Sequence, residues 1–135
     1  MLGFYKNFDW FDSDHDTRTN QMNRIAMGKL GETLASEYLQ SLGHTILFQN
    51  YRKRVGEIDI ISLENGRLHC SEVKTWNESF GFFPLESLHA TKRARMRKVY
   101  FYLLQEIPAF FHLTPSFNLI HITEKKEVRF YSSIF

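Results

Sequence analysis

The dipeptide Asn65-Gly66 constrains the fold more than any other feature of this sequence. It lies between two β-rich runs, GEIDIISL at 56–63 and LHCSEVKTW at 68–76. An Asn-Gly pair between two such runs is the strongest short-range signal of a β-hairpin with a two-residue turn. The centre of the chain is therefore predicted to be an antiparallel pair of strands.

The turn also predicts the register of the two strands. With Asn65 and Gly66 at its centre, Asp59 faces Glu72 across the hairpin. Facing residues point to the same side of a sheet, with side chains about 5 Å apart. Lys74 follows two residues after Glu72 and lies on that side too. One turn thus groups an aspartate, a glutamate and a lysine.

This group is chemically unusual because apolar residues surround it. They occupy alternate and adjacent positions on both strands, which predicts a sheet covered on both faces. Two buried carboxylates that face each other repel, and their burial costs free energy unless a charge compensates them. A hard divalent cation such as Mg²⁺ does so well. The alternative is a structural salt bridge to Lys74, but buried ion pairs add little net stability, so a functional site is favoured.

The remaining segments predict an α/β fold. Apolar spacing predicts a helix over 21–42, ended by Gly43, and a second helix from about Pro84 to Gln105. Further strands are expected at 45–51, 117–122 and 127–131. The order is α-β-β-β-α-β-β, which we interpret as a mixed β-sheet flanked by helices.

Length and charge define the domain organisation. With 135 residues the chain is long enough for one domain, and its single cysteine, Cys70, cannot form an internal disulfide and is expected in the core. Residues 1–20 carry four aspartates against Lys6 and Arg18, a net charge of −2, among several aromatic residues. We expect them to be either a loosely held extension or a segment that docks on a partner or on the basic face of the domain, with the domain proper at 21–135. No apolar run reaches the length of a membrane span and no secretory signal is evident, so we expect a cytoplasmic protein.

Three short motifs resemble the signature of the bacterial YraN-like family. They are GKLGE at 28–32, GEIDI at 56–60 and EVK at 72–74. This family is related to Holliday-junction resolvases within the restriction-endonuclease-like PD-(D/E)XK superfamily. The resemblance covers roughly residues 24–105 and implies an endonuclease-like fold.

The resemblance also implies a role for each site residue. Asp59 and Glu72 would hold Mg²⁺ or Mn²⁺ together with the backbone carbonyl of Val73, and Lys74 would orient the attacking water. Glu32 would support the metal. Judged from its own helix, Glu32 shares a face with apolar residues, so it either reaches toward water or points at a cation.

Two basic clusters are candidates for nucleic-acid binding, with ordinary solvated surfaces as the alternative. The candidates are Arg52, Lys53, Arg54, Lys92, Arg93 and Arg95. The six histidines are scattered along the sequence without the usual zinc-ligand spacing, so no zinc site is expected.

The sequence therefore supports two functional hypotheses. The first is a Mg²⁺-dependent nuclease that acts on phosphodiester bonds, in branched or structured DNA. The second is a nucleic-acid-binding module that keeps the endonuclease fold but cleaves weakly or not at all. A homodimer is expected if the chain resolves junctions, because a resolvase makes two cuts.

Overall fold

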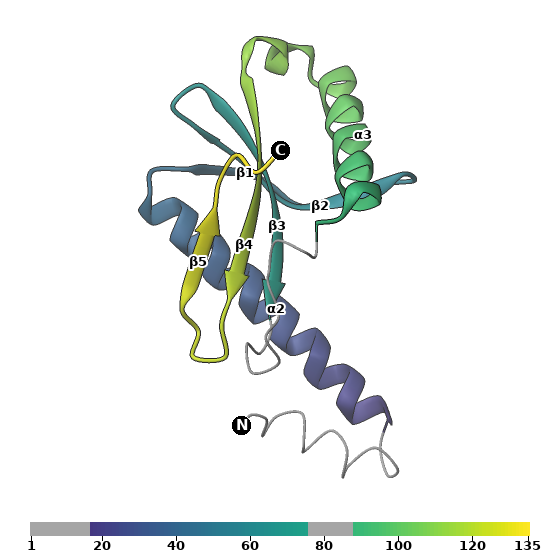
Figure 1. Cartoon of the computed structure of the whole chain (residues 1–135), viewed down its shortest axis with the longest axis vertical. Coiled ribbons are helices and arrows are strands. Elements are labelled where there is room, and N and C mark those ends of the chain that lie inside the picture. Colours follow the sequence, from purple (N-terminus) through teal and green to yellow (C-terminus); the bar gives the residue numbers. More distant parts are fainter. Residues whose placement is uncertain (1–16, 76–87) are drawn as a thin grey trace.

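A computed structural model describes residues 17–75 and 88–135, with side chains from residue 21 onward. A five-stranded mixed sheet is flanked by two long helices (Figure 1). This confirms the predicted α/β class and the order α-β-β-β-α-β-β. In chain order the elements are α2 (Thr17–Ser41), β1 (Thr45–Lys53), β2 (Gly56–Glu64), β3 (Arg67–Thr75), α3 (Ala90–Glu106), the 3₁₀ helix η2 (Pro108–His112), β4 (Thr114–Ile122) and β5 (Val128–Tyr131).

The strands lie in the sheet in their sequence order. β1–β2, β2–β3 and β4–β5 pair antiparallel, while β3 and β4 are parallel and are connected through α3. Asn65 and Gly66 have φ angles of 50° and 74°, which are the left-handed values that a two-residue hairpin turn requires. The β2–β3 pairs run from Glu64–Arg67 inward and follow the predicted register.

Each face of the sheet carries its own apolar core. On the α3 side, Met96, Val99 and Leu103 belong to the same buried cluster as Ile61 and Cys70. Each large apolar side chain buried in this way contributes about 1.5–3 kcal/mol relative to exposure. The prediction that Cys70 is a core residue is confirmed.

The second core lies between α2 and the sheet. It consists of Ala35 and Leu39 from the helix and Ile60, Ile120 and Ile122 from the strands. The sheet is therefore covered on both sides, as the apolar runs predicted. Among the described residues, no helix combines the length and apolar character needed to cross a bilayer.

Two predicted helix boundaries need correction. α3 begins at Ala90 and not near Pro84, because His89 is extended and its side chain accepts the Lys92 N–H as an N-cap; Pro84 itself lies outside the described residues. α2 begins at Thr17, four residues before the predicted domain boundary at 21, so the end of the predicted extension is helical. The remainder of that extension, 1–16, lies outside the described residues.

Candidate active site

The site is a row of polar residues across β1, β2 and β3. The β1–β2 pairs on either side place Asn50 opposite Asp59. The β2–β3 pairs end at Ile60–Ser71, so Asp59 and Glu72 are the next residues along their strands, and the charge of Glu72 acts on Asp59. Three adjacent strands thus each bring one polar side chain to the same level of the sheet.

Asp59 is held by the backbone of the neighbouring strand. The Val73 N–H donates to Asp59 Oδ2 over 2.8 Å. Burial, and after it the charge of Glu72, raises the pKa of Asp59 to about 7, although the Val73 hydrogen bond opposes the shift. The charges of Glu32 and Glu57 raise the pKa further. The carboxylate form of Asp59 is therefore electrostatically strained in the protein without a cation.

Glu72 is the most deeply buried carboxylate of the site, with a side chain 5% exposed. Its Oε2 lies 2.7 Å from Lys92 Nζ and 3.4 Å from Lys74 Nζ. Its Oε1 is buried and has no hydrogen-bond partner within residues 21–75 and 88–135. A buried carboxylate oxygen without a partner is costly, and it is free to bind a cation.

Glu32 reaches the row from α2. Its Oε1 accepts a hydrogen bond from Asn50 Nδ2 over 3.3 Å, and Asn50 has a left-handed backbone with a φ of 54°. The neighbouring Gly31 lets α2 approach the end of β3, because a Cβ at this position would overlap Thr75 Oγ1. Close helix–strand contact thus places Glu32 beside the sheet. Asn50 is a site residue to which the sequence assigned no role.

The donor set fits a hard divalent cation. Asp59 and Glu72 offer carboxylate oxygens, the ligand type that Mg²⁺ and Mn²⁺ prefer, and Glu72 Oε1 is unused within the described part of the chain. The structure brings Glu32, Asp59, Glu72 and Lys74 into one region, where the sequence placed them. Their metal-binding and catalytic roles remain predictions.

The two predicted basic clusters meet beside this site. A Cβ added at Gly56, at the start of β2, would lie 3.3 Å from Arg95 Cβ, so the β1–β2 turn packs against α3. The cluster Arg52–Arg54 is therefore close to the basic residues of α3. Arg54 and Arg95 are exposed.

The other candidate basic residues have intramolecular contacts. Arg52 pairs with Glu57 at 2.9 Å on the surface, and Lys53 pairs with Glu106. Arg93 Nε donates to the Leu88 carbonyl over 2.6 Å. Lys92 contacts Glu72, a pairing that the sequence did not predict.

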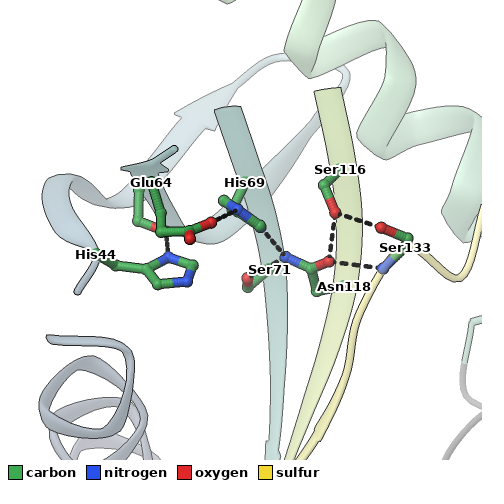
Figure 2. A network of polar contacts seen from close by, with 8 residues as sticks. His44, Glu64, His69, Ser71, Ser116, Asn118 and Ser133 are labelled. Atoms are coloured by element: carbon green, nitrogen blue, oxygen red, sulfur yellow. Dashed lines mark hydrogen bonds and ion pairs between the residues drawn. The ribbon is translucent and has the colours of Figure 1, made fainter. Parts of the chain in front are cut away.

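A separate polar cluster corrects the expectation that the histidines are scattered. His44, Glu64 and His69 form a possible metal-binding group, with one ligand atom from each lying within 4.8 Å of the others. The three side chains lie close together (Figure 2), and the centres of the two imidazole rings are 4.4 Å apart. The three residues also line a pocket of about 370 Å³. The β1–β2 pairing brings His44 to the end of β2, and the β2–β3 pairing brings His69 there, so the group has no signature in sequence spacing.

Hydrogen bonds determine the tautomer of His69. The Ser133 N–H donates to Asn118 Oδ1 over 2.9 Å, so the Asn118 amide group faces His69 Nδ1 at 3.1 Å (Figure 2). Since Nδ1 accepts, the ring proton sits on Nε2 and is donated to Glu64 Oε1 over 3.2 Å. A cation could use His69 Nε2 only after this proton left. Burial is the main cause of the lowered pKa values of both His44 and His69.

Comparison with known proteins identifies the family. The model of the uncharacterised protein family UPF0102 matches residues 31–122, a span that includes every strand of the site. The chain belongs to the UPF0102 family. This confirms the expected YraN-like membership.

Several UPF0102 proteins are similar over most of their length. The relative from Leptospira interrogans is 41% identical over 108 residues, covering 80% of this chain and 93% of the relative. Those from Clostridium novyi and Lachnoclostridium phytofermentans are 42% and 35% identical, covering 78% and 84% of this chain and 88% and 96% of each relative. The name shared by these relatives states no activity.

Proposed function

We propose that this UPF0102 protein is a divalent-metal-dependent nuclease that hydrolyses phosphodiester bonds, with branched or structured DNA as its substrate. The observation that carries the proposal is the pair Asp59 and Glu72. Two neighbouring carboxylates, one with a raised pKa and the other with an unpartnered buried oxygen among the described residues, lie beside Lys74. Such strained groups in one place are typical of a functional site.

Each residue of the site would have its own role in hydrolysis. Asp59 and Glu72, with the Val73 carbonyl, would hold Mg²⁺ or Mn²⁺, and Glu32 would support this charge. A bound cation supplies Lewis-acid stabilisation of the negative charge on the phosphate. The Lys74 ammonium would orient a water toward the phosphorus and offset charge that develops during the attack.

The surface beside the site suits a polyanion. Arg54 and Arg95 are exposed on neighbouring elements and would contact the phosphate backbone without reading sequence. Binding through such contacts weakens as salt concentration rises. Replacement of both residues by glutamine should lower DNA affinity and reduce its salt dependence.

A second candidate function is a nucleic-acid-binding protein with little or no cleavage. The observation in its favour is that Lys74 and Lys92 both contact Glu72, so this carboxylate is already compensated without a metal. The basic surface would then be the functional feature and the acidic row a structural one.

Calorimetric titration with Mn²⁺ separates the two functions. The intact chain should bind Mn²⁺, while Asp59→Asn and Glu72→Gln should each lower the affinity at least tenfold. Glu57→Gln is the matched control, because this half-exposed glutamate on the same strand forms its ion pair with Arg52 at the surface and is the weakest of the charges acting on Asp59. The nuclease proposal also requires Mn²⁺-dependent cleavage of an end-labelled four-way DNA junction, which both site variants should abolish. Absence of metal binding, with DNA present, would refute it and leave the binding function.

A further inference from the structure

Lys92 makes the shortest charged contact of Glu72. Its Nζ lies 2.7 Å from Glu72 Oε2, whereas Lys74 Nζ is 3.4 Å from the same oxygen. The two lysine side chains are about equally exposed, at 31% and 29%, while Glu72 is buried. Within the described part of the chain, both lysine ammonium groups therefore contact Glu72 Oε2, and Oε1 has no hydrogen-bond partner.

The position of Lys92 in its helix is electrostatically unfavourable. It lies in the first turn of α3, three residues after the N-cap His89. The N-terminus of a helix carries partial positive charge, so a cation there is unfavourable for the helix. The contact with Glu72 offsets this cost. The helix interior does not require a lysine at this position.

The start of α3 is held firmly enough to direct this side chain. The His89 ring accepts the Lys92 N–H, and Arg93 Nε donates back to the Leu88 carbonyl. One turn further on, Arg95 packs close to Gly56 on β2. The ammonium of Lys92 is therefore presented to Glu72 from the start of a well-anchored helix.

A cation and Lys92 would compete for the same carboxylate. A dication bound by Asp59 and Glu72 would repel the ammonium, because the charges would lie a few ångströms apart in a poorly solvated place. We propose that Lys92 is the counter-ion of Glu72 in the metal-free protein, and that metal binding releases it to contact a phosphate of the substrate. This proposal rests on the proposed function, since it assumes a metal at Asp59 and Glu72.

Substitution of Lys92 tests the competition directly. Lys92→Met should bind Mn²⁺ at least fivefold more tightly than the intact chain, a typical size for such coupling. The same variant should cleave junction DNA at least tenfold more slowly at saturating Mn²⁺. Lys92→Arg, which keeps the charge, should bind Mn²⁺ as the intact chain does, and Lys98→Met on the same helix should leave metal affinity unchanged. Unchanged or weaker Mn²⁺ binding by Lys92→Met would overturn the proposal.

A second measurement follows Lys92 in the intact sequence and uses variants only as references. With the lysines carrying ¹³C-methyl labels, the Lys92 NMR signal is identified by its absence in Lys92→Arg. In Glu72→Gln the Lys92 ammonium has lost its carboxylate partner. Mg²⁺ should shift the Lys92 signal of the intact chain toward the position that the signal has in this variant. A bound metal with an unmoved Lys92 signal would refute this proposal and leave the proposed function intact. Failure of the intact chain to bind metal would refute both.

Discussion

Replacement of Asp59 by asparagine should stabilise the metal-free protein at neutral and alkaline pH. Burial and the charge of Glu72 raise the pKa of Asp59 from its ordinary value of 3.8 to about 7. The folded state therefore binds this proton more tightly than the unfolded chain does, and stability falls as pH rises from about 4 to about 7. The substitution removes the charge, and the oxygen of the new amide can still accept the Val73 N–H.

The size of the effect follows from that shift. Each pKa unit corresponds to about 1.4 kcal/mol, so a rise of about three units sets an upper limit near 4 kcal/mol. Movement of the Glu72 side chain can relieve part of its repulsion with Asp59. We therefore expect Asp59→Asn to raise the free energy of unfolding by about 2–4 kcal/mol at pH 8. The difference should shrink toward zero as the pH is lowered toward 4 and below, where the Asp59 carboxyl becomes protonated in the folded and the unfolded state alike.

The assay is urea denaturation at several pH values in the presence of a chelator. Glu57→Gln serves as the control. Its surface pair with Arg52 is worth at most about 1 kcal/mol, and Glu57 is the smallest of the causes that raise the pKa of Asp59, so its loss should stabilise the fold far less than Asp59→Asn does. With saturating Mn²⁺ the advantage of Asp59→Asn in free energy of unfolding should shrink or reverse, because only the intact site gains stability from the bound metal. An Asp59→Asn protein no more stable than the original at pH 8 would refute the argument that this carboxylate is strained.

Three further predictions concern packing and the polar cluster. Gly31→Ala should cost about 1–3 kcal/mol in urea denaturation, because its Cβ would overlap Thr75 Oγ1, and Thr75→Ala should recover most of the loss; a loss below about 0.5 kcal/mol would contradict the close contact. Burial raises the pKa of the Cys70 thiol to about 12, so labelling by a chromogenic disulfide reagent at pH 8 should occur only as fast as the protein unfolds, and rapid labelling would show that the thiol is accessible. Asn118→Asp should create Zn²⁺ affinity at least tenfold above that of the original protein, because an acceptor opposite His69 Nδ1 would move the proton there and free Nε2; equal Zn²⁺ binding in calorimetry would show that the tautomer assignment is wrong.

The sequence was most informative where structure is local. The Asn65-Gly66 turn predicts its own conformation and, through the alternation of side chains along a strand, the whole β2–β3 register. The observed pairs reach Ile60–Ser71, so the turn brings Asp59 and Glu72, the next residues along the two strands, close together. Apolar runs on both sides of these residues likewise predicted a sheet covered by helices.

Contacts between elements distant in the sequence could not be obtained in this way. Lys92 is twenty residues from Glu72 along the chain, and only the packing of α3 on the sheet brings its ammonium within 2.7 Å. Asn50 reaches Glu32 through a left-handed backbone that no sequence pattern indicates. The start of α3 was misjudged because a proline suits a first helical turn in general, whereas the cap at His89 decides the start here.

The sequence by itself determined the elements, their order and the nearness of Asp59 and Glu72, because these depend on turn chemistry and on side-chain periodicity along short stretches of chain. The tertiary structure alone decided which charges compensate that pair, and it assembled His44, Glu64 and His69 around a pocket. It also settled the tautomer of His69, through a backbone N–H sixty-four residues away at Ser133. The physical reason is that ion pairs and hydrogen bonds act over a few ångströms, and only folding brings such distant residues that close.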